Sequence, residues 1–356
     1  MNQKLAVSFA GLAVGLVAVC LGMLGNPANM AICVACFIRD TAGSLGLHRA
    51  ETVQYMRPEI IGIVFGAFFA GLAKKEFASK GGSSPFTRFA LGVCVMVGAL
   101  VFLGCPLRMV LRIAGGDMNA AVGLLGFALG ILTGIFFLNK GFSLRRSYDQ
   151  PAVEGLGLPA ANALLLILLV ASPAILFFSA SGPGSMHAPL LLSLAGGLIV
   201  GAAAQRSRLC FVGGVRDAIM FRDFHMLVPF AVVLVTVLIG NLATAKFALG
   251  FEGQPLAHTE WAWNVLSLYL VGFGSVLLGG CPLRQLVLAS CGNSDAAVTV
   301  LGFFAGAAIC HNFGLASSGA GTTAGGHVAF AVCTAFTLAT AIANIRKLPD
   351  AREVPT

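Results

Sequence analysis

Charged residues are scarce in this sequence. Only 10% of the 356 residues are Asp, Glu, Lys or Arg, 58% are hydrophobic, and the mean hydropathy is +0.91. A soluble domain carries about 25% charged residues, so this chain cannot cover a water-facing surface. The same composition excludes a disordered chain and a disulfide-stapled secreted domain. What remains is a polytopic membrane protein.

Several signatures of enzyme chemistry and nucleic-acid binding are also missing. The sequence has no His/Glu metal motif, no phosphate-binding loop and no nucleophile–base signature, so we expect no metal, no cofactor, no enzymatic activity and no ATP-driven mechanism. The net charge is +8, but no basic run carries interleaved aromatic residues, which argues against nucleic acid as a partner. The excess of Lys and Arg is typical of cytoplasmic loops in a membrane protein.

The ten cysteines do not form the pattern of a disulfide framework, because almost all lie within or beside apolar runs. Any one of them is by default a small buried hydrophobic residue. We interpret five in this way, and they are Cys20, Cys94, Cys291, Cys310 beside His311, and Cys333.

Apolar runs about as long as a membrane-spanning helix recur along the chain. The first, residues 5–25, lacks a signal-peptide cleavage site and is interpreted as a retained span. Nine further runs begin near residues 58, 86, 119, 160, 188, 226, 262, 296 and 326, which predicts an all-α protein with about ten transmembrane helices. Four intervening segments are too interrupted to cross alone and are predicted to be re-entrant, namely residues 29–48, 104–114, 207–222 and 280–291.

The distribution of basic residues predicts the orientation. With ten spans, one side collects most Lys and Arg outside the re-entrant segments, including Lys74, Lys75, Arg145 and Arg146. The positive-inside rule then places both termini in the cytoplasm of a multi-pass protein in the cell inner membrane.

The sequence repeats itself. Gly104-Cys105-Pro106-Leu107-Arg108 returns 176 residues later as Gly280-Cys281-Pro282-Leu283-Arg284, and Asn119-Ala120-Ala121-Val122 meets Asp295-Ala296-Ala297-Val298 at the same offset. Upstream, residues 36–40 (CFIRD) resemble residues 210–217 (CFVGGVRD) with three residues inserted. The chain is therefore predicted to be a duplication, with repeats over residues 1–182 and 183–356. Five spans in each half force the second copy to insert upside down, a pattern typical of transporters.

The duplicated Gly-Cys-Pro-Leu-Arg motif has a definite chemistry. Glycine breaks the preceding helix, and Pro106 or Pro282 fits the first position of the next helix. Cys105 and Cys281 then fall at the N-cap, at the positive end of the helix dipole, which favours anions. With Arg108 and Arg284 one turn along, two thiols and two guanidiniums can converge on one small anion. The alternative is that both arginines are structural and bond carbonyls at a helix end.

The segments before these motifs contain two further cysteine sites. The adjacent charges in Arg39-Asp40 and Arg216-Asp217 indicate internal pairs that brace the segments holding Cys36 and Cys210.

Cys33 and Cys36 have the C-x-x-C spacing of a thiol–disulfide pair. Because the second half has Ser207 at the first position, we assign Cys36 to the repeat and leave Cys33 outside it. The alternative function is a membrane thiol–disulfide oxidoreductase that uses Cys33 and Cys36 with a quinone.

These motifs resemble a known family. Residues 26–30 (NPANM), residues 33–40 (CVACFIRD) and the two Gly-Cys-Pro-Leu-Arg motifs are similar to the YeeE/YedE family of membrane proteins, over about residues 5–345. The most similar branch is YedE, which is associated with selenium transport. The resemblance implies an inverted-repeat fold in which short helices dip to a central constriction.

The resemblance also implies a substrate and a path for it. In the thiosulfate-transporting members, cysteines at the constriction pass the ion along, and the matching positions here are Cys105, Cys210 and Cys281, with Cys36 as the mate of Cys210. The Pro-Leu-Arg that follows Gly-Cys in this chain departs from the thiosulfate branch, so thiosulfate and a selenium compound both stay open. A cytoplasmic sulfur-carrier protein is the partner that the family implies.

Overall fold

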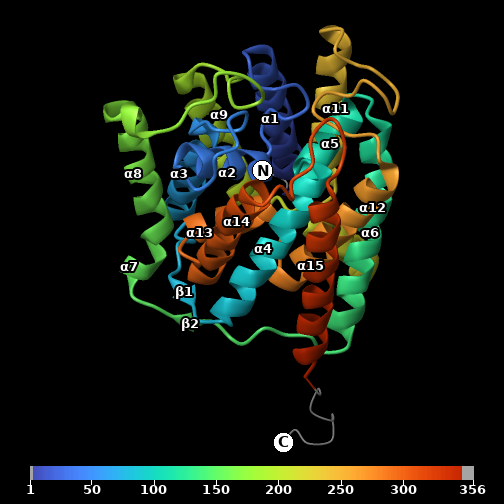
Figure 1. Cartoon of the computed structure of the whole chain (residues 1–356). Helices are drawn as coiled ribbons and strands as arrows, with labels where there is room; N and C mark the ends of the chain where they lie inside the picture. Colours follow the sequence, from blue (N-terminus) through green and yellow to red (C-terminus); the bar gives the residue numbers. More distant parts are fainter. Residues whose placement is uncertain (1–2, 347–356) are drawn as a thin grey trace, which may run out of the picture.

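The computed structural model describes residues 3–346, which form fifteen α-helices, one 3-10 helix and one two-stranded ribbon (Figure 1). The elements before residue 183 are α1 (Gln3–Met23), α2 (Val34–Ser44), α3 (Pro58–Ala73), β1 (Lys80–Gly81), α4 (Pro85–Phe102), α5 (Pro106–Ala114), α6 (Met118–Asn139), β2 (Tyr148–Asp149), α7 (Ala152–Gly155), α8 (Gly157–Ala171) and the 3-10 helix Pro173–Ile175. Those after it are α9 (Leu190–Ser207), α10 (Phe211–Phe221), α11 (Val228–Ala243), α12 (Trp261–Leu278), α13 (Pro282–Ser290), α14 (Ser294–Asn312) and α15 (Ala324–Ala343).

Seven helical stretches of the described chain are long and apolar enough to cross a membrane, judged by length and composition. They begin at α1, α4, α6, α9, α12, α14 and α15. Three further apolar helices, α3, α8 and α11, have 16, 15 and 16 residues. At 1.5 Å per residue each is about 24 Å long, which is less than the ~30 Å hydrocarbon core of a bilayer. The fold is therefore mostly helical with seven candidate spans, and the sheet is limited to two strands of two residues.

The outer helices expose apolar side chains. On α8, Leu164, Ile167 and Val170 are 56–65% exposed, and on α15, Val328 and Val332 are 65% and 62% exposed. A water-soluble protein does not present such a continuous apolar surface, so these helices face lipid.

The long helices pack in pairs that join the two parts of the chain. Helix α3 runs along α9, α6 along α12, α4 along α14, and α1 along α11. Glycine permits the close approach: a Cβ at Gly66 of α3 would collide with the Leu198 carbonyl of α9, and a Cβ at Gly126 of α6 with the Val265 carbonyl of α12. These pairs account for much of the high glycine content that the sequence shows.

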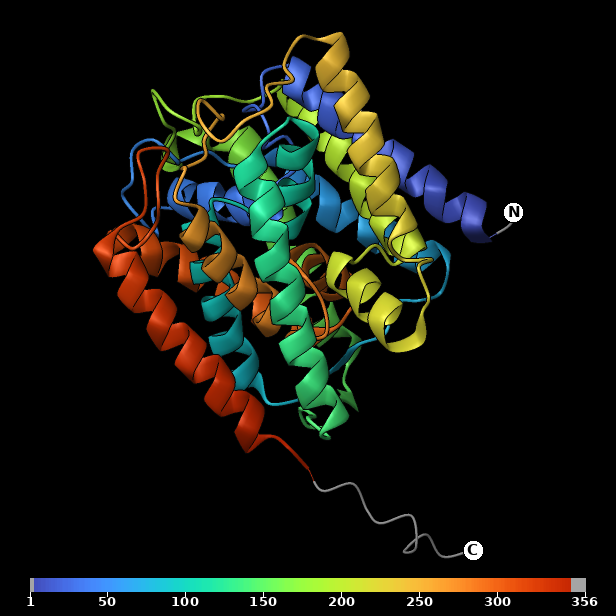
Figure 2. The ribbon, with the colours of Figure 1, turned by 90° about the vertical axis from the view of Figure 1, so that its right-hand side faces the viewer.

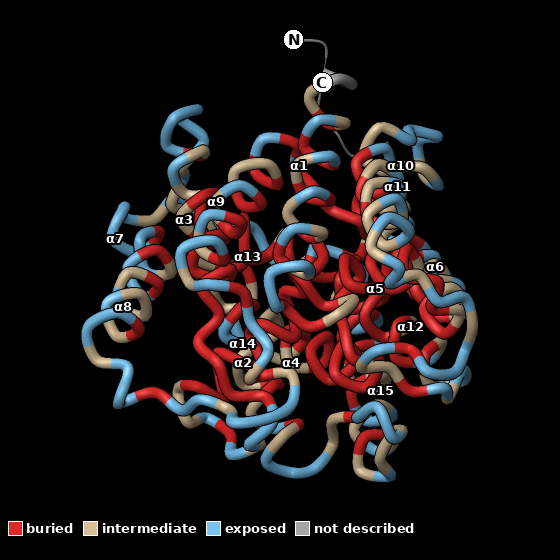
Figure 3. The backbone as a smooth tube through the Cα atoms, turned by 90° about the horizontal axis from the view of Figure 1, so that it is seen from above, coloured by how far each residue is buried: buried red, intermediate tan, exposed pale blue. Residues whose placement is uncertain are grey.

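Four short helices of 9–11 residues lie among the long ones, and they are α2, α5, α10 and α13. All eleven residues of α2 and eight of the nine in α5 are buried. Figure 3 shows the buried residues gathered around α2, α4, α5, α13 and α14, with the exposed ones on the periphery. Three of the interrupted segments, which form α2, α5 and α13, thus make up the centre of the molecule. Helix α10 lies at the edge of the bundle (Figure 2), and only its first four residues are buried.

Corresponding elements recur in the same order after residue 183, with α9 to α15 following the pattern of α1 to α6 and α8. The helix contacts follow the same correspondence. Helix α4 contacts α14, and the counterparts of these two helices, α12 and α6, contact each other. The division into repeats at residues 182 and 183 stays a prediction.

Candidate functional site

Each of the four short helices begins directly after a cysteine. Cys33 is the N-cap residue of α2, Cys105 of α5, Cys210 of α10 and Cys281 of α13. Pro106 and Pro282 begin α5 and α13, where a residue without an N–H costs no hydrogen bond. All four thiols are buried, so each lies at the positive end of a helix dipole and away from bulk water.

The cysteines form two clusters. In the first, the Cys33 Sγ lies 3.8 Å from the Cys105 Sγ and 2.9 Å from the Cys36 Sγ. In the second, the thiols of Cys210 and Cys281 interact with each other. The structure thus brings Cys36 to Cys105 and Cys210 to Cys281, the four path residues that the sequence analysis selects.

The structure changes the alignment of the repeat. Cys33 and Cys210 are both N-cap residues, and each Sγ accepts a hydrogen bond from the backbone N–H three residues on, from Cys36 and Gly213 respectively. Cys33 is therefore the counterpart of Cys210, and Cys36 is the counterpart of Gly213. The expected three-residue insertion is not needed in this alignment.

A signal for the correct alignment is present in the sequence. Arg39-Asp40 and Arg216-Asp217 are 177 residues apart, and so are Cys33 and Cys210. The sequence analysis instead aligned Cys36-Phe37 with the identical Cys210-Phe211. It therefore assigned Cys36 to the repeat and left Cys33 outside it.

The two arginines of the duplicated motif differ in their partners. Arg108 donates to the backbone carbonyls of Asn29, Leu103 and Leu256, and its Nη1 lies 3.3 Å from the Cys36 Sγ. The Nη1 of Arg284 is buried and has no hydrogen-bond partner among the described residues. Arg108 therefore has the geometry of the structural alternative, whereas Arg284 keeps a donor free for a ligand.

A cavity of about 310 Å³, here called the Arg108 cavity, lies beside the first cluster. It is lined by Arg39, Arg108 and Leu103, by His311 and by residues 316–319 of the loop between α14 and α15. This loop is at the end of the bundle away from β1 and β2 (Figure 1). The Arg108 cavity therefore leads from that end toward the guanidinium that contacts Cys36.

Two further cavities, here called the Arg284 cavities, lie beside the second cluster. Their volumes are about 320 and 290 Å³, and both are lined by Arg208 and Arg284. The first also reaches Lys80 of β1, and the second reaches Cys210. Because Lys80 belongs to the opposite end of the bundle from the Arg108 cavity (Figure 1), the two thiol clusters lie beneath cationic cavities of opposite ends.

The ion pairs near the two clusters differ in solvent exposure. Asp40 accepts from Arg39 at 2.6 Å and from Arg57 at 2.7 Å, with the side chains 0–5% exposed. The pair Arg216–Asp217 is also formed, at 2.8 Å, but its side chains are 34% and 22% exposed. The Asp40 carboxylate is thus held between two buried cations, whereas the Arg216–Asp217 pair can rearrange at a modest cost in free energy.

Sequence reasoning missed three buried groups. Arg57 reaches Asp40 from 17 residues away, and Arg112 pairs with Asp117 at 2.6 Å. Glu59 is fully buried and accepts from Asn26 and Ser193. The contacts of Arg57 and Glu59 join residues that only the tertiary fold brings together. The pair Arg112–Asp117 spans only five residues, so its spacing was a local sign that the sequence analysis did not use.

Cys310 and His311 line the Arg108 cavity. The His311 ring lies tilted against the His48 ring, with the ring centroids 4.7 Å apart, and no group of three potential metal ligands occurs among the described residues.

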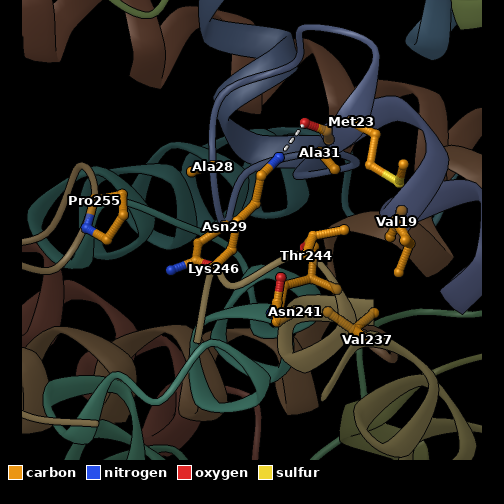
Figure 4. Close-up of a pocket in the computed structure, with 13 residues that line it drawn as sticks. Val19, Met23, Ala28, Asn29, Ala31, Val237, Asn241, Thr244, Lys246 and Pro255 are labelled. Atoms are coloured by element: carbon orange, nitrogen blue, oxygen red, sulfur yellow. Dashed lines mark hydrogen bonds between the residues drawn. The ribbon is translucent and has the colours of Figure 1, made fainter. Parts of the chain in front are cut away.

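A separate cavity of about 260 Å³ lies between α1 and α11 (Figure 4). Its lining is mostly apolar and contains no cysteine, and the Lys246 Nζ at its edge bonds the Gly22 carbonyl.

Comparison with known proteins agrees with this geometry. Residues 206–345 match the family model described as "Sulphur transport". The chain is also 28% identical over 96 residues to the thiosulfate transporter TsuA of Escherichia coli (strain K12), and the match covers 27% of each chain. The aligned region thus spans about a quarter of that relative's length. Together the two matches support membership of this chain in the YeeE/YedE family.

Proposed function

We propose that this chain is a membrane transporter that carries a small sulfur- or selenium-containing anion through the centre of the bundle. The anion passes along the thiols of Cys33 and Cys105 and those of Cys210 and Cys281. The observation that carries the proposal is the pair of thiol clusters at helix N-termini, each beneath an arginine-lined cavity at opposite ends of the bundle.

Thiols suit this substrate class. A thiol is a weak hydrogen-bond donor, and sulfur and selenium are large, polarizable and weak acceptors. The resulting contacts hold the anion loosely, and a path conducts only when each site releases what it binds. The helix dipoles and Arg284 supply the attraction for negative charge that the thiols lack. Thiosulfate and a selenium analogue satisfy the same site.

In the proposed topology, residues 1–182 and 183–356 are inverted repeats of five spans each, and α2, α5, α10 and α13 are re-entrant helices. The seven long apolar stretches and the three shorter apolar helices together supply ten spans. The basic residues Lys74, Lys75 and Lys80 mark the end that holds β1 as cytoplasmic. Both termini and the Arg284 cavities then face the cytoplasm of a cell whose inner membrane holds the protein.

The family resemblance suggests a cytoplasmic sulfur-carrier protein as the partner at this end. Such a partner would accept the anion where it leaves the Arg284 cavities.

Transport is favoured over thiol–disulfide catalysis by Cys33 and Cys36. The family matches concern transporters, and the second half has Gly213 where a second thiol would be needed. A repeated catalytic pair is therefore absent from the sequence, whereas the repeated N-cap thiols are present.

The test is uptake of labelled thiosulfate into vesicles that hold the purified protein. We expect Cys105→Ala and Cys281→Ala each to lower uptake about 10- to 100-fold, because each removes one donor from a path whose sites act in series. Cys20→Ala is the matched control, since Cys20 is an exposed cysteine of α1 outside both clusters. Normal uptake by both cap variants at normal protein levels would refute the thiol path. Competition with a selenium analogue distinguishes the two substrates.

A further inference from the structure

The first cluster holds one thiol more than the second. Cys36 lies one helical turn after Cys33, whereas the position three residues after Cys210 is Gly213. In the proposed path, the second half therefore carries the anion without a thiol at position 213. Cys36 has no counterpart in the proposed path, which raises the question of what it does.

The geometry around Cys36 favours a disulfide with Cys33. The two Sγ atoms are 2.9 Å apart, and an S–S bond is about 2.05 Å long, so they need to approach by less than about 1 Å. The residues are an i, i+3 pair on one face of the first turn of α2. The Cys33 Sγ already accepts a hydrogen bond from the backbone N–H of Cys36, which holds the Cys33 side chain beside Cys36.

A cation stands beside the same sulfur. The Arg108 Nη1 lies 3.3 Å from the Cys36 Sγ, and a guanidinium at that distance stabilises negative charge on sulfur. Arg108 also lines the Arg108 cavity. Because Cys33 and Cys36 are themselves fully buried, we expect oxidants and reductants to reach them by way of this cavity.

We propose that hydrogen peroxide converts Cys33 and Cys36 into a reversible disulfide, and that this modification closes the transport path. The Cys36 thiolate attacks one peroxide oxygen, the O–O bond breaks, and a sulfenic acid and hydroxide form. The Cys33 thiol then attacks the sulfenic sulfur, and its proton leaves with the hydroxyl group as water. The two thiols lose two electrons in total, and peroxide is reduced. A dithiol reductant reverses the reaction by exchange.

The disulfide removes Cys33 from the path. An S–S bond has no S–H to donate, so the contact of Cys33 with Cys105 at 3.8 Å loses one of its two thiols. The loss of uptake rests on the proposed function, whereas the disulfide itself does not.

The experiment treats the full-length protein in vesicles with hydrogen peroxide and follows both mass and uptake. We expect a peptide in which Cys33 and Cys36 are joined, with the loss of two hydrogen atoms, and a fall in thiosulfate uptake of at least about tenfold. Dithiothreitol should restore both. In Cys36→Ala and Cys36→Ser, uptake after peroxide should equal the uptake of the same untreated variant, because the disulfide can no longer form.

The second half offers a matched gain-of-function variant. A Cβ built on Gly213 would lie 3.4 Å from the Cys210 Cβ and 3.5 Å from the Cys210 Sγ, which is ordinary contact. Gly213→Cys in the Cys36→Ala background should therefore move the peroxide sensitivity to the second half, with a disulfide between Cys210 and position 213.

Three results would overturn the inference: no Cys33–Cys36 disulfide in the peroxide-treated wild type, undiminished peroxide inhibition in both Cys36 variants, or no crosslink in the Gly213→Cys variant. A disulfide that forms in a protein without any thiosulfate uptake would instead refute the proposed function and leave the modification site standing.

Discussion

The two thiol clusters are built on the same motif but are supported differently. Around the first, Arg108 is held by three backbone carbonyls and Asp40 by two buried guanidiniums. Around the second, Arg284 keeps a buried donor without a partner, and Asp217 has one half-exposed partner. The same sequence motif thus forms one rigid site and one adaptable site. A transporter needs both properties, since a fixed element selects the substrate while a mobile one lets it leave.

The largest effect is expected at the centre of the rigid site. Asp40→Asn removes the carboxylate that neutralises Arg39 and Arg57, which leaves two buried cations without compensation. We expect the free energy of unfolding to fall by about 3–5 kcal/mol. The matched variant Asp217→Asn should lose no more than about 1 kcal/mol, because its pair is partly exposed.

Thermal unfolding of the two variants in the same detergent measures this difference. Equal losses for Asp40→Asn and Asp217→Asn would contradict the contrast between a rigid and an adaptable site.

Substitutions of the two motif arginines should have different effects, on uptake for Arg284 and on the amount of folded protein for Arg108. Arg284→Ala is expected to lower uptake about tenfold, the equivalent of about 1.4 kcal/mol, without lowering the amount of folded protein. Arg284→Lys should restore part of the uptake, since Lys keeps the charge but not the planar donor fork. Arg108→Ala should instead lower the amount of folded protein, because three carbonyls lose their donor.

Fluorescence-detected size-exclusion chromatography and uptake, measured on the same preparations, distinguish these outcomes. Full uptake by Arg284→Ala at normal protein levels would show that this arginine does not guide the anion.

The smallest effect concerns the rim of the Arg108 cavity. The loop between α14 and α15 is anchored by Thr322, whose backbone N–H and hydroxyl donate to the Glu260 carboxylate at 2.9 and 2.6 Å. These hydrogen bonds lower the pKa of Glu260 from its ordinary value of 4.5. Their stabilisation is therefore present above pH 4.5 and is lost as the pH falls through the lower pKa of the folded state.

Hydrogen exchange of residues 313–323, corrected for the intrinsic rate at each pH, should show this loss of protection on acidification. Glu260→Gln should remove most of the pH dependence. An unchanged dependence in that variant would assign the effect to another group.

The parts of the fold that depend on neighbouring residues could be predicted from the sequence. The starts of α5 and α13 follow from Pro106 and Pro282, because proline acts on its own backbone. The preceding helices end at the left-handed residues Leu103 and Gly279, one position before the motif glycines. The register of α2 against α10 could not be predicted in this way, since the Cys-Phe identity at Cys36 and Cys210 conflicts with the matched spacing of Cys33 and Cys210. The backbone of Cys33, extended at φ −73° and ψ 107°, decides which cysteine caps the helix. Contacts such as Arg57 with Asp40 depend on tertiary packing that no local pattern encodes.

The pairing of helices across the two parts of the chain has a consequence for biosynthesis. Helix α4 has its main partner in α14, which is synthesised about 190 residues later. The partners of α3 and α6, which are α9 and α12, are also synthesised later. Helices inserted early therefore stay in the bilayer with their glycine faces unpaired until the second half arrives. A truncated first half cannot complete these interfaces, so we expect it to be a substrate for membrane proteases. The order of synthesis makes the last helices, α14 and α15, the ones that commit the protein to its folded state.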